Sequence, residues 1–458
     1  MQPQQPDDRR CLSIRISLIL ILLSHAIAPA DPDDCPPGCN VCALKEKANT
    51  PVPGLTWGAD LRLRSEHLDN GKLDEEEERS ADVWRQRVRT RVWTKAQPMD
   101  NVTLACRLTA EPWYFSEPDS LDEQFTRDEA LIDQLFVNWQ NQGTRPLQIT
   151  AGRQDIRLGD GWLVRRGTPR DSSRTNFFDA LRTTLILDNH HSDLDLIYLR
   201  NHANSSWLAR PFNDADLDLS EQDATGVIVY GRYRRVPNTE LDAYFIYKHD
   251  DRVAVEGNDA DIYTLGLRTA GPLSSGWSCR AELAPQFGHK NGTDLCALGF
   301  TGLLSYALND ACQSELRVGY EYRSGDHDPN GAFDILWGRY GSNVANLFGG
   351  AAALEGQVSH LSNFHRLRVG WTGDLTDNLR LACDYGPMFR DENPWADTTG
   401  FSDDGTVRGH LVTGSASYQI SRHASTDVLG EVFFPGDYYE APYDDTATYL
   451  RWQMMLVW

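Results

Sequence analysis

The sequence has 458 residues, a formal net charge of −22 at pH 7 and a mean hydropathy of −0.49. Beyond its first 30 residues it contains no run of 18 consecutive apolar residues, which excludes a transmembrane helix. The low mean hydropathy suits a soluble protein and a membrane β-barrel equally, because only alternate residues of barrel strands face lipid. The pattern of residues along the chain must therefore decide between a soluble protein and a membrane β-barrel.

Residues 1–30 have the pattern of a secretory signal peptide. Charged residues precede a short apolar run at 16–23, and alanines follow at 26, 28 and 30. The run is too short to cross a bilayer as a helix, and the Ala-x-Ala pattern ends just before Asp31. We therefore expect removal of residues 1–30 and a mature chain outside the cytoplasm; a short buried helix is the alternative.

Residues 31–54 are rich in Pro and Asp and are expected to form a periplasmic leader ahead of the folded domain. Cys35, Cys39 and Cys42 have a C-x3-C-x2-C spacing that also occurs at iron–sulfur sites. In an exported, oxidising location a disulfide is favoured over a metal cluster. No metal site is predicted there.

From residue 55 to 458 the chain alternates apolar and polar residues between clusters of turn-forming residues, which is typical of strands and hairpins. The segment 82–95 places arginines on one face and large apolar side chains on the other. The arginines are Arg85, Arg87, Arg89 and Arg91, and the apolar residues are Trp84, Val88 and Val92. One face of such a strand suits lipid and the other suits water, as the wall of a membrane barrel requires.

The breaks between these strands alternate between long and short. Long breaks are expected near residues 67–81, 112–128, 159–176, 201–222, 249–259, 287–294, 324–358, 388–407 and 435–445. Short breaks are expected near residues 97–101, 141–146, 189–192, 235–239, 271–275, 308–311, 373–377 and 421–424. Nine long and eight short breaks separate 18 strands, with both ends of the domain on the short-turn side.

The predicted fold is all-β: a transmembrane antiparallel up-and-down β-barrel of about 18 strands over residues 55–458. A soluble β-sandwich or propeller is the alternative, but no repeat of about 40–50 residues supports a propeller.

The sequence carries no recognisable catalytic motif: it has no Gly-x-Ser-x-Gly elbow, no His-Glu-x-x-His and no P-loop. We therefore expect no enzymatic activity and no cofactor. Residues 326–331 match the first half of a calcium-binding loop, but Trp337 stands where the loop needs a bidentate Glu. We expect this loop and other acidic outer loops, such as 74–78, to be ordinary solvated loops. Weak calcium binding in them is the alternative.

Arginine dominates the basic residues, since only 6 of the 44 are lysine. Arginines at alternate positions of one strand repel each other and are tolerated only facing water, lipid headgroups or an anionic ligand. Rings of arginine favour anions inside a pore. The arginines predicted to line the lumen are Arg62, Arg64, Arg85, Arg87, Arg89, Arg91, Arg107, Arg153, Arg182, Arg366, Arg368 and Arg451. The alternative is that they pair with carboxylates such as Glu111 or Glu321 and merely fill a plugged interior.

Four segments, in order along residues 55–458, carry a resemblance to the bacterial alginate export family. They are Gly-Arg-Gln…Gly-Asp at 152–160, Phe-Asp…Arg at 178–182, Ser-Gly-Asp at 324–326 and Phe-Pro-Gly-Asp-Tyr at 434–438. The resemblance implies an 18-stranded outer-membrane barrel that carries a polyanionic uronate polysaccharide through an arginine-rich constriction. Arg153 and Arg182 lie within the matched segments, whereas the cysteine leader is not part of the family pattern.

The expected function is therefore passive export of an anionic, alginate-like polysaccharide across the outer membrane. Its expected partners are the polysaccharide, outer-membrane lipid and periplasmic export components, with no nucleic acid. A general anion-selective porin for small solutes and a structural or adhesive barrel are the alternative functions.

Overall fold

The computed structural model describes residues 49–50, 52–70, 82–117, 125–126, 130–141, 143, 146–165, 177–187, 191–204, 220–255, 257–338 and 362–458. The predicted signal peptide, the three cysteines of the leader and the acidic segment 74–78 lie outside these residues. Within them no helix is long and apolar enough to cross a membrane.

The described residues contain twenty strands and one short 3-10 turn, η2 (Pro329–Gly331). The strands are β1 (Leu55–Asp69), β2 (Asp82–Met99), β3 (Val102–Ala110), β4 (Trp113–Glu117), β5 (Phe125–Thr126), β6 (Ala130–Asn141), β7 (Leu147–Gln154), β8 (Phe178–Leu187), β9 (Ser192–Asn201), β10 (Gln222–Tyr233), β11 (Glu240–Arg252), β12 (Ala260–Ser274), β13 (Trp277–Lys290), β14 (Thr293–Ala307), β15 (Glu315–Arg323), β16 (Phe364–Thr376), β17 (Leu379–Phe389), β18 (Val407–Ser421), β19 (Ala424–Pro435) and β20 (Ala447–Val457).

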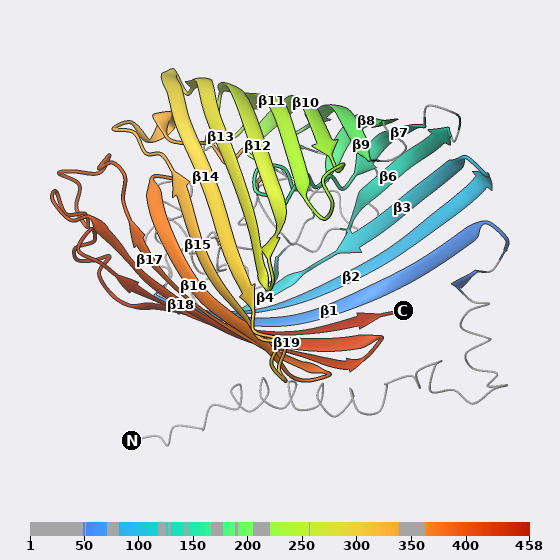
Figure 1. Ribbon diagram of the computed structural model, residues 1–458. Helices are drawn as coiled ribbons and strands as arrows, with labels where there is room; N and C mark the ends of the chain where they lie inside the picture. Colours follow the sequence, from blue (N-terminus) through green and yellow to red (C-terminus); the bar gives the residue numbers. More distant parts are fainter. Residues whose placement is uncertain are drawn as a thin grey trace, which may run out of the picture.

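Eighteen of these strands form a closed antiparallel barrel, because β1 pairs with β20 as well as with β2 (Figure 1). β4 and β5 stand apart: β4 extends the line of β3 beyond Glu111 and Pro112 and pairs with β2, and β5 pairs only with β4. β3 itself pairs with β6, so the ring continues without them. The predicted barrel of about 18 strands is confirmed.

One predicted long break is wrong. β13 continues to Lys290 and β14 begins at Thr293, so the expected loop at 287–294 is a two-residue turn. Asn291 and Gly292 both have positive φ angles, 50° and 85°. A two-residue hairpin turn of type I′ needs this left-handed backbone at both positions, and Asn-Gly is the pair that adopts it most easily.

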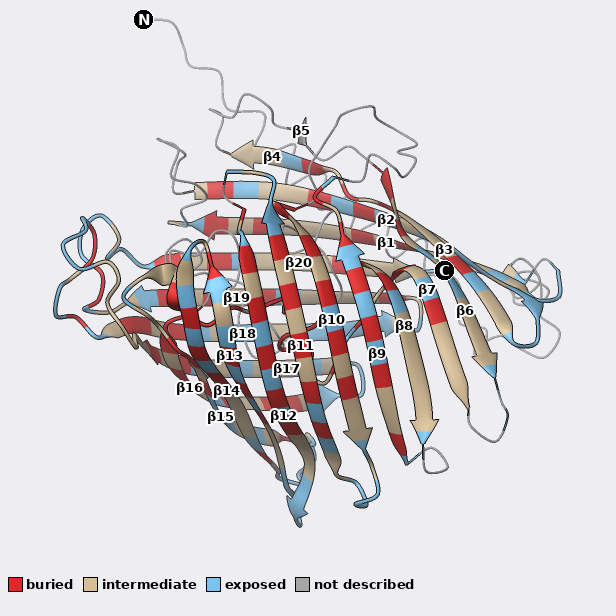
Figure 2. Cartoon of the chain, turned by 90° about the horizontal axis from the view of Figure 1, so that it is seen from above, coloured by how far each residue is buried: buried red, intermediate tan, exposed pale blue. Residues whose placement is uncertain are grey.

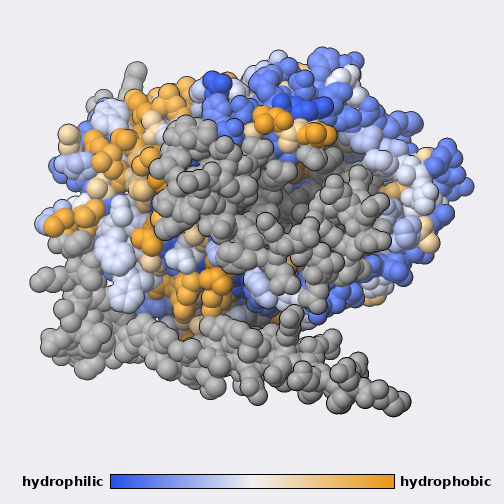
Figure 3. Space-filling model, turned by 180° about the vertical axis from the view of Figure 1, so that it is seen from behind, coloured by the Kyte–Doolittle hydropathy of each residue, from blue (hydrophilic) through white to orange (hydrophobic). Residues whose placement is uncertain are grey.

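The strands alternate between two faces, as the sequence predicts (Figure 2). In β12, Tyr263, Leu265 and Leu267 are exposed, whereas Ile262 and Thr264 are fully buried between them. Figure 3 shows hydrophobic residues gathered in patches on the outer surface of the barrel. An outer face of this kind is suited to lipid.

Two connections at the long-loop end turn back into the barrel. Residues 156–164 follow β7, residues 332–337 precede β16, and a parallel bridge joins Val164 to Trp337. Trp162 stacks on Phe333 with ring centroids 5.6 Å apart. These loops share one hydrophobic cluster with interior side chains of β8 to β14.

The barrel wall makes room for these rings at two glycines. A Cβ atom on Gly226 would lie 2.4 Å from Trp337, and one on Gly299 would lie 2.4 Å from Phe333. Any larger residue would push the rings off the wall, since such distances are far below van der Waals contact. The loops and the wall are therefore matched in shape.

Candidate functional site

Seven arginines of three adjacent strands lie together inside the barrel, and we call them the arginine wall. They are Arg62 and Arg64 of β1, Arg85, Arg87, Arg89 and Arg91 of β2, and Arg451 of β20. Each alternates with apolar residues of the outer face, as Arg87 and Arg89 do with the exposed Val88. The arginine wall thus follows directly from the period of two along a strand.

The strand register sets like charges opposite each other in this wall. Arg62 faces Arg89, and Arg64 faces Arg87, across the β1–β2 pair. Like charges directly opposite on neighbouring strands are destabilising. Carboxylates or solvent must therefore compensate them.

Four carboxylates supply part of that compensation. Glu66 accepts a hydrogen bond from Arg85 Nε at 2.5 Å and another from the Tyr449 hydroxyl at 2.8 Å. Glu111 pairs with Arg62, and accepts from Arg87 Nε at 3.1 Å. Asp60 pairs with Arg91 at 2.7 Å, and Asp427 with Arg451 at 2.8 Å.

In the ion pairs described for this wall, seven arginines share four carboxylates. Accessibility varies within it: the side chain of Arg87 is 3% exposed, whereas those of Arg91 and Arg85 are 21% and 18% exposed. Arg89 reaches Asp60 only at 3.5 Å. Arg91 is therefore the most exposed arginine of the wall, and the largely buried Arg89 beside it is weakly paired, which gives a passing anion donors that it can use.

The break between β3 and β4 positions Glu111. Pro112 has no N–H for a strand ladder, and its carbonyl accepts from Val88 N at 3.3 Å where the ladder resumes. Just beyond it, the Trp113 ring lies under Arg85 and Arg87, with guanidinium carbons 4.6 and 4.5 Å from the ring centroid. This aromatic face holds the two guanidinium groups in the wall by cation–π contact.

Four other predicted arginines also lie on the interior side, but each is paired. Arg107 binds Asp133 in a fork, at 2.7 and 2.8 Å. Arg182 binds Asp195 at 2.7 Å. Arg366 binds Glu321 at 3.0 Å, and Arg368 binds Asp384 at 2.8 Å. These pairs match the alternative in which carboxylates neutralise the arginines.

Arg153 is placed differently from the other eleven. Its register partners are Leu135, which is 46% exposed on the outer face, and Asp179. Asp179 binds its guanidinium in a fork at 2.8 Å, and Phe177 covers it with the ring centroid 3.6 Å away. Arg153 therefore clamps the ends of β7 and β8 and is not one of the interior arginines of the wall.

Sequence reasoning missed the groups that hold the inward loops. Asp334 lies 2.8 Å from Lys290 and 3.5 Å from Lys248, and all three side chains are less than a tenth exposed. Trp162 Nε1 donates to Glu321 at 3.1 Å, and Arg268 binds Asp160. The only signal in the sequence was that three of its six lysines fall within barrel strands, two of them Lys248 and Lys290.

The ion pairs fix the ionisation of Asp334. Burial alone would raise the pKa of its carboxyl, but Lys248 and Lys290 hold that pKa well below its usual range. The nearby Asp328 also has a lowered pKa, because the Thr293 hydroxyl and the Asn330 N–H donate to its carboxylate. Both groups are ionised at neutral pH.

The calcium-loop pattern forms a capped turn. Asp328 accepts from Thr293 Oγ1 at 2.6 Å and from Asn330 N at 2.9 Å, at the start of η2. In the part of the chain that the structure describes, no three His, Cys, Asp or Glu side chains are grouped so that they could hold a metal ion.

Comparison with known proteins adds a family and a fold. The profile of the family described as alginate export matches residues 54–453. No curated protein sequence is significantly similar to the chain. Among solved structures, it is similar to Pseudomonas aeruginosa OccK11 (OpdR), with 13% identity, a TM-score of 0.53, and coverage of 88% of this chain and 96% of that chain. It is also similar to OpdQ of the same organism, with 12% identity, a TM-score of 0.54, and coverage of 88% and 97%.

Proposed function

Because the chain belongs to the alginate export family, we propose that its barrel passively exports an anionic, alginate-like polysaccharide through an arginine-lined interior. The chain is an outer-membrane channel, and its family and fold are those of transport barrels. The observation that carries the finer proposal is that the seven arginines of the arginine wall share four carboxylates in their described ion pairs.

A uronate polymer presents one carboxylate per sugar ring, and guanidinium groups match carboxylates in a planar fork. Strong pairing would trap the polymer, whereas several weak sites allow it to move on. In this wall Arg91 is the most exposed arginine, and it shares the one carboxylate of Asp60 with the largely buried Arg89. A polymer carboxylate can exchange with Asp60 there without leaving a charge unpaired.

Planar-bilayer recordings of the purified barrel test this proposal. We expect the double variant Arg87→Gln/Arg89→Gln to weaken anion selectivity, measured as the reversal potential in a KCl gradient. Arg87 is buried against two carboxylates, so the double variant could fail to fold. The single variant Arg89→Gln, which leaves Arg87 in place, therefore tests selectivity separately. Arg200→Gln is the matched control, since Arg200 is exposed on the outer face of β9. Unchanged selectivity in both wall variants would remove the arginine wall from the mechanism.

A general porin for small anions is the second candidate, and the inward loops at 156–164 and 332–337 favour it because they narrow the interior. Alginate added on one side separates the two functions: an exporter passes long chains, and a small-solute porin is only blocked by them. Absence of any conductance would leave a structural or adhesive barrel.

A further inference from the structure

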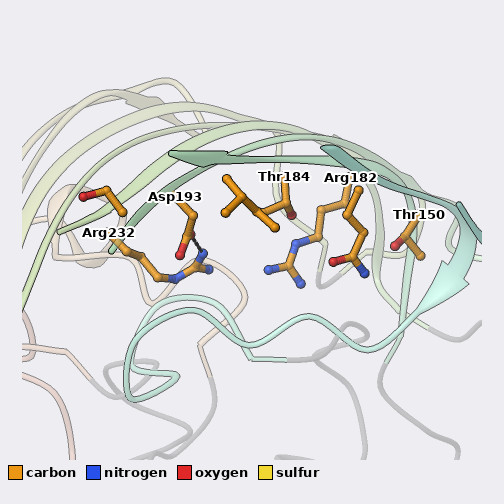
Figure 4. Close-up of a pocket in the computed structure, with 8 residues that line it drawn as sticks. Thr150, Arg182, Thr184, Asp193 and Arg232 are labelled. Carbon is orange, nitrogen blue, oxygen red and sulfur yellow. Dashed lines mark hydrogen bonds and ion pairs between the residues drawn. The ribbon is translucent and has the colours of Figure 1, made fainter. Parts of the chain in front are cut away.

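A polar cavity of about 230 Å³ lies on the inner wall far from the arginine wall, between β7, β8, β9 and β10. Figure 4 shows its lining side chains projecting from the strands into the interior. The residues are Gln148, Thr150, Arg182, Thr184, Ile186, Ser192, Asp193 and Arg232. Nearly all of them lie near the short-turn ends of their strands, which in bacterial barrels is the periplasmic side.

The charges of this cavity are already balanced. Asp195, fully buried behind it, accepts from Arg182 Nη2 at 2.7 Å, from Arg232 Nη2 at 2.6 Å and from Thr184 Oγ1 at 2.5 Å. Arg232 Nη1 also pairs with Asp193. Two arginines and two aspartates sum to zero, whereas in the arginine wall seven arginines share four carboxylates.

Hydrogen-bonding capacity nevertheless remains in the cavity. The fork from Arg182 to Asp195 uses Nε and Nη2, which leaves Nη1 as a further donor on a side chain that is 26% exposed. Gln148 adds a planar amide with both a donor and an acceptor. Ile186 contributes an apolar patch beside these groups.

From this combination we propose that the cavity is a sugar-binding subsite at the periplasmic mouth, which takes one ring by its hydroxyl groups and not by its carboxylate. Planar polar groups bond to neighbouring hydroxyls in pairs, and the apolar patch suits the C–H face of a ring. A neutral cavity gains little from a charged ligand. Its volume lies below the roughly 300–1,000 Å³ of pockets for drug-sized ligands, so it fits a single ring.

This inference rests on the proposed function in one respect: a polysaccharide arriving from the periplasm would meet the cavity before the arginine wall. The subsite would engage the ring, and the wall would then act on the carboxylates. The two sites should therefore respond to different chemical probes, one to hydroxyls and the other to charge.

The test is current blockade of the reconstituted full-length protein by oligosaccharides added on the periplasmic side. The probes are a neutral glucan oligosaccharide, a uronate oligosaccharide of equal length and a polyethylene glycol of equal size. Gln148→Trp fills the cavity, and Gln148→Ala removes one amide. Gln140→Trp and Gln140→Ala are matched controls, because Gln140 faces Gln148 across the β6–β7 pair but does not line the cavity.

We expect blockade times for both oligosaccharides to fall about threefold to tenfold in Gln148→Ala, as the loss of one hydrogen bond implies, and further in Gln148→Trp. The Gln140 variants should match the unaltered protein, and blockade by the neutral probe should not depend on salt. Equal blockade by polyethylene glycol, or no difference between the Gln148 and Gln140 variants, would overturn the subsite. Reversal potentials report on the arginine wall separately, so each proposal can fail alone.

Discussion

The two sides of the barrel interior are stabilised in different ways. On the side of β8 to β14, the wall carries alanines, aliphatic residues and two stacked tyrosines, and the inward loops bury Trp162 and Trp337 against it. On the side of β20, β1 and β2, the wall carries seven arginines and four carboxylates. One side resembles the core of a soluble protein, and the other resembles a solvated ion-pair network.

The difference shows how one barrel can hold its loops firmly and still leave charges accessible. Shape and apolar contact fix the loops on the first side, and one buried group of Asp334, Lys248 and Lys290 adds a specific anchor. On the second side, seven arginines share four carboxylates in the ion pairs described. We expect loop variants to change pore size and wall variants to change selectivity.

The largest effect should come from Asp334→Ala. It leaves Lys290 buried without its carboxylate, and removing one partner of a buried pair costs about 3–5 kcal/mol. The loop should detach, so single-channel conductance should rise and the thermal midpoint should fall. Asp328→Ala is the control, because Asp328 lies in the same connection but is bound by the Thr293 hydroxyl and not by a lysine. A normal conductance together with a normal thermal midpoint would show that the ion pair does not anchor the loop.

Glu111→Gln should act on the other side of the interior and change selectivity more than pore size. It keeps the shape of the side chain but removes one negative charge from the arginine wall. Arg62 and Arg87 lose a charged acceptor, which costs about 1.5–3 kcal/mol. The reversal potential should shift toward stronger anion selectivity while conductance stays within the range of the unaltered protein. A shift of the reversal potential toward cation selectivity would contradict the role given to the arginine wall in this comparison of the two sides.

The sequence predicted the barrel well because the period of two is a local property of each strand. The alternation in 82–95 placed Arg85 to Arg91 on one face, and β2 carries them on one face. The hairpin at Asn291 was missed because acidic and polar residues around it resembled a loop, although Asn-Gly is itself a strong signal for a tight turn.

Long-range partners could not be predicted in the same way. Whether Arg89 is paired depends on the β1–β2 register, which sets Asp60 beside Arg91, and a single strand does not contain that information. The loop that carries Trp162 folds inward because a glycine in a distant strand leaves space for the ring, and the sequence of the loop does not show this. Arg153 was misplaced because its motif does not reveal the Asp179 clamp.

A smaller effect is expected from Gly226→Ala, which tests the contact between Trp337 and the barrel wall directly. The new methyl group would lie 2.4 Å from the ring, and overpacking of this kind costs about 1–3 kcal/mol. The thermal midpoint should fall moderately, and protease cleavage near Trp337 should become faster. Gly231→Ala in the same strand is the control, since its nearest neighbour would lie at 3.7 Å. Equal cleavage rates in the two variants would show that the loop does not need the space that Gly226 leaves for Trp337.

The smallest effect should be the response of the loop anchor to mild acid. The folded pKa of Asp334 lies well below its usual range, because Lys248 and Lys290 outweigh the raising effect of burial. A depressed carboxyl pKa contributes stability that is present above the unfolded value of about 3.9 and is lost as pH falls through that value toward the folded one. Conductance and thermal midpoint should therefore stay constant from neutral pH down to about pH 5. In stronger acid the conductance should rise as the loop detaches, and the thermal midpoint should fall. Asp334→Asn removes this titration, so its conductance should not rise further in the same range of acid. Opening of the unaltered channel near pH 6 would mean that Asp334 is not the group that anchors the loop.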